Sequence, residues 1–325
     1  MSASISAGRL IARLSRYGLI LALIAVFSIF SAAAPTFLTT GNLQSILVNN
    51  FTLLAIVSIA MTLAVSAGGI DLSVGTAVDF ASFAFVSLVL AGQPVALALL
   101  AALLAGALVG AFNAILISAI GVSPFLATLG TLFIGRSIQQ LLTNGGNPVY
   151  LAPNGVPEAF RFLGHGTIAG LPVPLLIAAV VISSVAVLYS RTRFGRVVLS
   201  IGLQPSVVRY SGIALGRDVA VIFILAGTVA AIAGIILTST VTVYIPSSGN
   251  AFLLNAIGAT FIGTTFSPLG RPNVAGTVLG VLLLSIVSNG LLLTGLNFYW
   301  QQVGTGSLIF AVLAFSFINQ KAVGA

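Results

Sequence analysis

The sequence has no cysteine, one histidine and only four acidic residues among 325. Without cysteine there can be no disulfide framework, thiolate metal site or cysteine nucleophile. The hydrolase and metalloprotease strings Gly-x-Ser-x-Gly and His-Glu-x-x-His are also missing, and the acids form no catalytic pair. The only lysine is Lys321, so the chain has no Gly-x-x-x-x-Gly-Lys-Ser/Thr loop for nucleotide phosphates. We therefore expect no enzyme, no metal site and no bound cofactor here, and any ATP used must be bound by another subunit.

Charge is scarce throughout the chain. Only 5% of the residues are charged and 58% are hydrophobic, whereas a soluble domain carries about a quarter charged residues. The sequence therefore predicts an all-α integral membrane protein. A helical span needs about 20 apolar residues, so the length leaves room for roughly eight to ten spans. The twelve Lys and Arg residues lie at a few loop positions, which indicates membrane topology and not nucleic-acid binding.

Prolines, glycines and polar residues divide the apolar sequence into ten expected helices. We expect them at residues 17–34, 45–66, 72–91, 95–120, 124–142, 175–189, 219–241, 251–262, 274–296 and 301–317. Segment 251–262 is short, and the sequence leaves open whether it is a full or a broken span. The glycines Gly106 and Gly110 form a small-xxx-small pair, which suits close helix packing. Together the helices predict one polytopic bundle, a single transmembrane domain over residues 1–325.

The arginines predict the orientation of this bundle. Five of them lie in the stretch 191–217, with only Asp218 to offset them, so this loop is expected in the cytoplasm. The stretch 143–174 has five prolines, six glycines and no excess of positive charge, so it is expected outside. Arginines also precede the first span, and Lys321 follows the last one. Both termini are therefore predicted to be cytoplasmic.

A weak internal repeat is visible in the glycines. Gly68 and Gly75 are seven residues apart, and so are Gly263 and Gly270, at an offset of 195. In the expected topology the two sets are six spans apart, which would make a parallel repeat of a kind known in transporters. Because glycine is abundant, a chance match is the alternative.

The segment Gly-Gly-Ile-Asp-Leu-Ser-Val-Gly at residues 68–75 interrupts a long apolar region. Its glycines, Gly68, Gly69 and Gly75, allow close backbone approach. The acid Asp71 is costly in apolar surroundings and is therefore a candidate functional group, with Ser73 beside it. The alternative is a tight turn that merely joins two membrane helices.

A few polar side chains within the spans are candidates for a transport pathway. They are Asn50, Asn113, Arg136, Asn289 and Tyr299. Polar residues in spans can equally hold helices together. A buried ion pair between Arg136 and either Asp71 or Asp79 is one hypothesis, and snorkelling of Arg136 to the interface is the other.

The cytoplasmic stretch contains a candidate docking segment at residues 202–216. Pro205 and Ser206 indicate a helix start, and Val207, Val208 and Ile213 give it apolar residues beside Arg209. Such a segment could contact a partner subunit. It could also be a polar connector whose arginines only fix the orientation.

These strings, in this order, resemble the membrane-spanning permease subunits of ribose-type sugar ABC importers. The resemblance rests on residues 68–75, on Pro124–Leu129 with Gly135-Arg136, on Thr192–Arg196 with Ser211–Ile213, on Asn255–Ile257, and on Asn289–Leu291. It implies two permease subunits in the bacterial inner membrane, two ATP-binding domains and an external sugar-binding protein. It also implies that the cytoplasmic loop contacts the ATPase, through residues that include Arg193, Gly195, Arg209, Ser211, Gly212 and Ile213.

The chain departs from that family at three places. The family has Glu-Leu-Asp-Ala-Ile where this chain has Leu-Leu-Asn-Ala-Ile at residues 253–257, so both acids are absent. An Asn is typical at Leu203-Gln204, and two alanines are common at Val207-Val208. These departures leave the identity of the sugar and of the partners open. The alternative functions are a secondary transporter, with Asp79 as a proton-coupling carboxylate, and a membrane scaffold without transport.

Overall fold

In this computed structural model the chain is described for residues 2–152, 155–267 and 270–324. The chain packs into two compact units. Unit 1 comprises residues 1–58 and 255–325, and unit 2 comprises residues 59–254. The boundaries between them fall inside two helices, α3 (Thr52–Ser66) and α12 (Asn250–Thr264).

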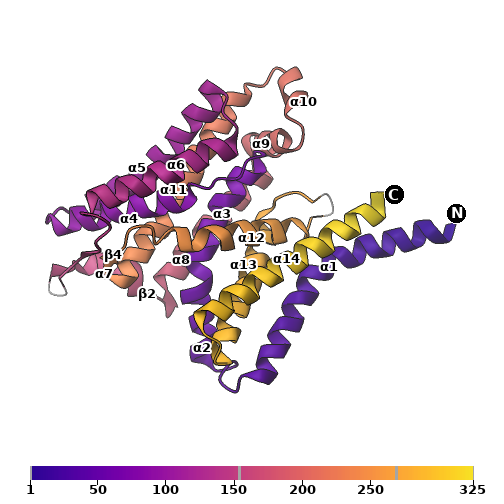
Figure 1. Cartoon of the computed structure of the whole chain (residues 1–325), viewed down its shortest axis with the longest axis horizontal. Coiled ribbons are helices and arrows are strands. Elements are labelled where there is room, and N and C mark those ends of the chain that lie inside the picture. The colour runs from indigo at the N-terminus through magenta and orange to yellow at the C-terminus, as the bar shows by residue number, and fades with distance from the viewer. Residues whose placement is uncertain (1, 153–154, 268–269, 325) are drawn as a thin grey trace. The chain divides into compact units, whose positions relative to one another are not determined.

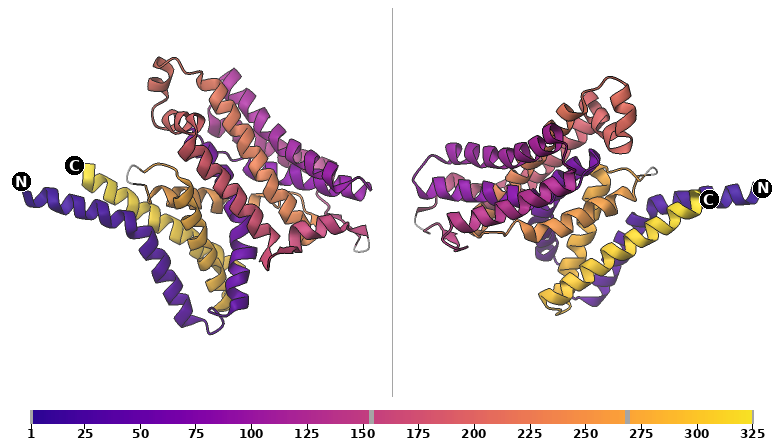
Figure 2. Two further views of the ribbon diagram at one scale, coloured as in Figure 1. Left: turned by 180° about the vertical axis from the view of Figure 1, so that it is seen from behind. Right: turned by 45° about the horizontal axis from the view of Figure 1, so that its top comes forward.

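Unit 1 is built around three long helices, α1 (Ser2–Ala33), α13 (Val274–Leu293) and α14 (Phe298–Gly324). They lie alongside one another, and both ends of the chain lie at the same end of the α1–α14 pair (Figures 1 and 2). The helix α2 (Thr40–Ser45) continues through a π-helical turn, η1 (Ile46–Phe51), into α3. The apolar core of the unit consists of Phe30, Ala34, Phe37, Ile46, Ile286 and Val287.

Unit 2 is centred on α4 (Val74–Leu90), α5 (Val95–Ala114) and α11 (Leu215–Val241), which pack against one another. The remaining elements are η2 (Ile115–Ile120), α6 (Pro124–Leu142), α7 (Glu158–His165), α8 (Val173–Arg191), α9 (Arg193–Leu203) and α10 (Pro205–Tyr210). Two short antiparallel ladders join β1 (Val149–Tyr150) to β4 (Val243–Tyr244) and β2 (Thr167–Ile168) to β3 (Leu171–Pro172). Figure 1 shows α9 and α10 at one end of α11, with α7 and β4 at the opposite end.

Glycine allows α5 and α11 to approach closely. A side chain at Gly106 would collide with the carbonyl oxygen of Gly227, and its Cβ would lie 2.6 Å from that of Ala231. A Cβ at Gly110 would lie 2.8 Å from the Cα of Ile224. The expected close packing at the Gly106–Gly110 pair is therefore confirmed.

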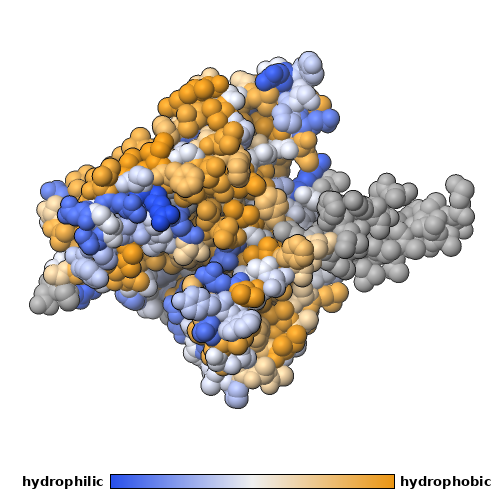
Figure 3. All heavy atoms as spheres, viewed as in Figure 1, coloured by the Kyte–Doolittle hydropathy of each residue, from blue (hydrophilic) through white to orange (hydrophobic). Residues whose placement is uncertain are grey.

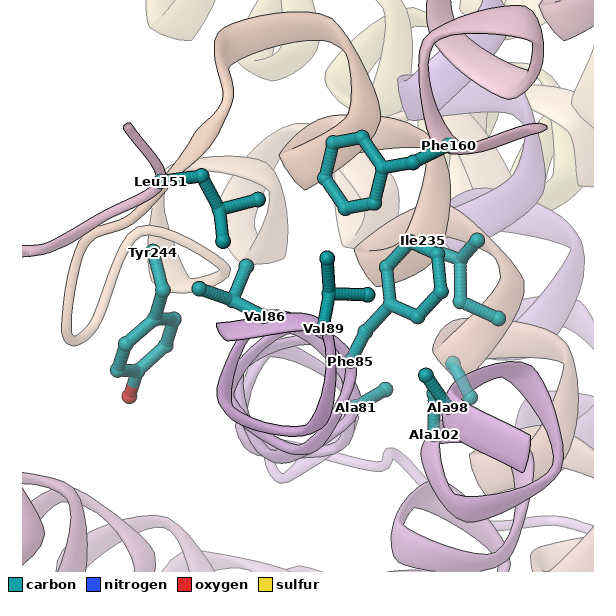
Figure 4. Packing of buried hydrophobic residues seen from close by; sticks show 11 residues of the cluster. Ala81, Phe85, Val86, Val89, Ala98, Ala102, Leu151, Phe160, Ile235 and Tyr244 are labelled. Carbon is teal, nitrogen blue, oxygen red and sulfur yellow. The ribbon is translucent and has the colours of Figure 1, made fainter. Parts of the chain in front are cut away.

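An apolar cluster closes the end of unit 2 that carries α7 (Figure 4). The rings of Phe85 on α4 and Phe160 on α7 stack with centroids 4.9 Å apart and an angle of 12° between their planes. Tyr244 adds its ring to this cluster, while its hydroxyl points away from the other labelled side chains in Figure 4. The loop predicted to be external therefore folds back onto the helices at this end.

The outer surface of unit 2 is largely apolar. On α5, the leucines at positions 97, 100, 104 and 108 are all about half exposed or more. Figure 3 shows apolar residues over much of the α5 and α6 surface in that view. A soluble protein rarely exposes apolar patches of this extent. These side chains are suited to contact lipid.

The observed helices follow the expected ones closely. The helical segments at 95–120 and 124–142 begin and end at the predicted residues. Among the described residues, five helical stretches are long and apolar enough to cross a membrane: Thr40–Ser66, Val95–Ile120, Val173–Arg191, Leu215–Val241 and Val274–Leu293. Three more are apolar but shorter. The structure thus confirms an all-α membrane protein, and the count of ten spans stays a prediction.

Several details differ from the sequence-based expectation. Segment 251–262 forms one uninterrupted helix, α12, and the expected external loop contains the helix α7 and the strands β1 to β3. The two glycine pairs of the possible repeat differ locally: Gly68 lies in a turn with φ of 84°, whereas Gly263 lies inside α12. The parallel repeat therefore gains no support at these positions and stays a prediction.

Candidate functional site at the break between α3 and α4

The signature segment 68–75 comprises most of the non-helical break between α3 and α4 and the first two residues of α4. Helix α3 ends at Ser66 and α4 begins at Val74. Thr128 of α6 meets two backbone groups of this break: its hydroxyl accepts from the Leu72 amide at 3.0 Å and donates to the Ile70 carbonyl at 3.1 Å. Non-helical backbone is tolerated at membrane depth only where protein or enclosed water meets its polar groups. Thr128 is the partner of the Ile70 carbonyl and the Leu72 amide, and Asp71 accepts from the Ser73 amide.

The carboxylate of Asp71 belongs to a chain of buried hydrogen bonds. Its Oδ1 accepts from the amide of Ser73 at 2.8 Å and from the Ser73 hydroxyl at 2.6 Å. The side-chain amide of Asn113 on α5 donates to the Ser73 oxygen at 2.6 Å, and the Thr131 hydroxyl donates to Asn113 Oδ1 at 2.5 Å. Asp71 therefore fixes the first turn of α4 and, through Ser73 and Asn113, links it to α5 and α6.

Two glycines of the segment are required for close contact. A Cβ on Gly69 would lie 2.6 Å from the Cβ of Pro124, at the start of α6. A Cβ on Gly75 would lie 2.9 Å from the backbone of Gly249. Cβ atoms do not approach backbone or ring atoms so closely, so any larger residue would force the neighbouring elements apart.

A second buried polar group lies further along α4. Asp79 is fully buried, and its Oδ1 accepts from the Gly249 amide at 2.7 Å and the Ser248 hydroxyl at 3.1 Å. Beside it, Gln139 Oε1 of α6 accepts from the Ser247 amide at 2.8 Å and lies 3.3 Å from the Tyr244 hydroxyl. Asp79 and Gln139 thus hold the turn that precedes α12.

The predicted ion pairs of Arg136 are not formed. Asp71 and Asp79 bond to Ser73 and to the turn before α12, and Arg136 lies on the exposed face of α6. The reason is the helical phase of α6. Its buried face carries Ala127, Thr128, Thr131, Gly135 and Gln139, whereas Arg136 lies on the opposite side, next to Phe133 and Ser137.

The other pathway candidates divide between the two units, with Asn113 in unit 2 and Asn50, Asn289 and Tyr299 in unit 1. Asn113 is buried in the Asp71 network, and the side-chain amide of Asn289 donates to Asn42 at 3.0 Å, so both serve helix packing in this structure. Asn50 is half-buried in the π-helical turn η1, a feature frequent at functional sites. Tyr299 is 77% exposed at the start of α14.

Several residues that build the site were not assigned a role from the sequence. They are Thr128, Thr131, Tyr244 and Ser248. A signal for those on α6 was present, since Thr128, Thr131, Gly135 and Gln139 are spaced by three or four residues along one helical face. The turn before α12 gave no comparable signal.

The structure brings part of the expected coupling segment together. Arg193 and Ile213 line one hollow of about 180 Å³, with Arg196, Val197 and Ser200. Gly195 packs against the end of α8, and the Ser211 hydroxyl donates to the Val207 carbonyl. Gly212 takes a φ of 75° in the turn after α10. Arg209 is exposed on α10.

Apolar side chains are exposed on the same segment. Leu203 is 49% exposed, Val207 52%, Tyr210 90% and Ile213 36%. They lie beside several exposed arginines. Exposed apolar groups with a charged rim are typical of a surface that binds another protein.

We predict that bulk in the signature segment is more harmful than loss of its charge. Gly69→Leu and Gly75→Leu should abolish the uptake that the family resemblance implies, because each side chain meets atoms of Pro124 or Gly249. Asp71→Asn should keep measurable uptake, because its amide oxygen can still accept from Ser73. Uptake is measured per amount of protein in the membrane.

The matched control is Gly306→Leu on α14, where a Cβ meets no atom within 4 Å, and it should behave like the parent. An inactive Asp71→Asn together with active leucine variants would make the carboxylate the working group and contradict this ranking.

We further predict that Asp79 acts as an acceptor for the turn before α12 and not as a proton carrier. Asp79→Asn keeps an oxygen for the Gly249 amide and should retain uptake. Asp79→Ala leaves that buried amide without an acceptor, which costs about 1–3 kcal/mol, so its thermal unfolding temperature and abundance should fall. Ser248→Ala removes only the longer hydrogen bond to Asp79, so its unfolding temperature and abundance should fall less. If Asp79→Asn is fully folded but inactive, proton chemistry at Asp79 is required after all.

Comparison with known proteins finds a matching family and several relatives. The profile of a family described as the permease component of branched-chain amino acid transport systems matches residues 42–313. The ribose import permease RbsC of Escherichia coli (strain K12) is 31% identical over 284 residues, which cover 87% of this chain and 88% of the relative. No solved structure matches the chain.

Two further relatives are named for the transport of other substrates. The D-allose transport system permease AlsC of Escherichia coli (strain K12) is 31% identical over 308 residues, covering 94% of this chain and 93% of the relative. The autoinducer 2 import permease LsrD of Yersinia enterocolitica is 34% identical over 277 residues, covering 85% and 81%. The chain therefore belongs to this family of transport permeases, and it is a non-enzymatic membrane permease of the ribose type found in ABC importers.

Proposed function

We propose that the chain forms the pathway by which a monosaccharide or related polyol crosses the bacterial inner membrane. The observation that carries this proposal is the similarity to ribose and D-allose permeases over about nine tenths of the chain. The fold supports it, because long apolar helices surround non-helical backbone that is satisfied inside the protein. Both termini and the segment 191–217 would lie in the cytoplasm, and the segment 143–174 outside.

The chemistry of the buried acids favours a neutral, hydroxyl-rich substrate. The family description mentions branched-chain amino acids, whose ammonium group would need an anionic partner along the pathway. Asp71 and Asp79, both buried, each direct an oxygen to backbone amides and hydroxyls of this chain. Sugar hydroxyls need hydrogen-bonding groups and no such charge.

Arg136 is the best-placed pathway residue of unit 2. An arginine is costly against lipid, yet it lies on the exposed face of α6 beside Ser137 and Gln140. Neither Asp71 nor Asp79 neutralises it, as both are used elsewhere. Arg136, Ser137 and Gln140 form a polar strip among exposed apolar residues such as Phe133 and Leu141, and this strip would line the water-filled pathway, where a second permease subunit, identical or homologous, completes the wall.

The energy would come from a partner. The chain has no phosphate-binding loop, so a separate ATP-binding subunit would hold the nucleotide, and an extracytoplasmic sugar-binding protein would deliver the substrate. The apolar side chains of Leu203, Val207, Tyr210 and Ile213, with the arginines around the hollow on α9, form a surface suited to that ATP-binding subunit. We call residues 203–213 the docking surface.

The complex reconstituted in lipid vesicles tests the function. Uptake of radiolabelled ribose or D-allose should require ATP and the binding protein, and it should survive collapse of the proton gradient by an uncoupler. Leucine is the control substrate and should not be taken up. Uptake of either sugar that follows an imposed proton gradient without ATP would favour a secondary transporter, and uptake of leucine alone would correct the substrate class.

A second prediction concerns the docking surface. Tyr210→Asp and Val207→Asp place a charge on exposed apolar positions outside the bilayer, so abundance should be unchanged while co-purification of the ATP-binding subunit and uptake are lost. These variants test docking more directly than a bulky residue at Gly212 would, because the φ of 75° at Gly212 would strain the backbone with any side chain. The control is Ser206→Asp, an exposed polar position on the same helix. Normal co-purification and uptake in both apolar-to-charge variants would exclude this surface from docking.

A further inference from the structure

The helix α9 lies between the docking surface and the break that follows α3. It begins at Arg193, after the N-cap residue Thr192, whose hydroxyl accepts from the Gly195 amide at 3.0 Å and donates to the Leu188 carbonyl at 2.6 Å. Its buried residues are Gly195, Val198 and Ile201. The docking surface begins at the last residue of α9, Leu203.

Glycines at two positions of α9 allow backbone-to-backbone contact. A Cβ on Gly195 would lie 2.6 Å from the Cα of Tyr189 at the end of α8. A Cβ on Gly202 would collide with the carbonyl oxygen of Ser66, and it would lie 3.1 Å from the amide nitrogen of Gly68. The two glycines are seven residues, or about two turns, apart and so lie on one side of the helix.

The contact at Gly202 is with the first residues of the break. Ser66 ends α3 and Gly68 opens the signature segment. A Cβ on Gly68 would in turn lie 3.3 Å from the Cα of Gly202, and its φ of 84° already disfavours a side chain. Direct backbone contact leaves no flexible side chain between the two elements, so displacement of one is passed to the other.

We propose that Gly202 is the positioning residue through which α9 moves the break between α3 and α4. The contact of Gly202 with Ser66 and Gly68 stays closed during transport, so that α9 and the start of the signature segment move as one body. This inference rests on the proposed role of the docking surface, and it adds where the motion enters the membrane helices. The hydrogen bonds from Asp71 through Ser73 and Asn113 would then transmit this motion from the break to α5 and α6.

The first test adds a single methyl group. Gly202→Ala must push α9 away from Ser66, whereas Gly216→Ala, at the start of α11, finds its nearest atom at 3.6 Å and is the matched control. We expect both variants to co-purify with the ATP-binding subunit and to show parental basal ATPase activity. Stimulation of ATPase by the sugar-loaded binding protein and uptake should be lost only in Gly202→Ala. Parental stimulation and uptake in Gly202→Ala would overturn the proposal.

The second test locks the contact and does not depend on the alanine variant folding. The sequence has no cysteine, so Ala67→Cys with Leu199→Cys gives one unique pair beside the contact, because Leu199 lies one turn before Gly202 on α9 and outside the docking surface. Joining the pair with a short bifunctional thiosulfonate should leave uptake intact, since the two elements move together. Uptake that stops on joining and returns on reduction, with single-cysteine variants unaffected by the reagent, would show that the contact must open and would overturn the proposal.

The two tests also separate this inference from the function on which it rests. If Tyr210→Asp loses co-purification and uptake while Gly202→Ala works normally, the docking surface stands and the route through Gly202 is wrong. If Tyr210→Asp is also normal, the proposed docking itself fails.

Discussion

The structure depends on one constraint: inside a bilayer, every backbone amide and carbonyl that leaves a helix must find a partner within the protein. The chain leaves helical geometry at the break 67–73 and again at the turn 245–249 before α12. Both are held from the same helix. Thr128 of α6 satisfies the first, and Gln139 of α6, with Asp79 of α4, satisfies the second. The polar stripe of α6 is thus a structural requirement of the two breaks.

This constraint separates structural polar residues from those available to a substrate. Asp79 and Asn113 are occupied in hydrogen bonds that fix backbone or join helices. Arg136 lies on the exposed side of α6, away from its buried residues Thr128 and Gln139, and neither Asp71 nor Asp79 pairs with it. The same helix therefore has one face that holds the breaks and an exposed face on which Arg136, which we propose for the pathway, lies among apolar side chains. Substitutions on the face with Thr128 and Gln139 should therefore lower stability, whereas substitutions of Arg136 should lower transport.

Composition and glycine spacing were sufficient to predict much of the fold. The bounds of α5 with η2 and of α6 follow from Pro, Gly and Asn at their ends, and the close packing at Gly106 and Gly110 follows from their spacing. The partners of Asp71 and Asp79 could not be predicted, because Asp79 bonds to residues about 170 positions away and opposite charge suggested Arg136 instead. The amphipathic helix α7 was missed because the prolines and glycines of the stretch 143–174 around it indicated a loop.

The central claim is that protein side chains, and not water, satisfy the break at the signature segment. Amide hydrogen exchange over residues 70–73, measured on the complex in lipid nanodiscs, tests it directly. The account predicts slow exchange in the parent at rest and faster exchange in Thr128→Val, with the interior of α5 unchanged. Exchange of this segment in the parent at the rate of an exposed loop would contradict the account.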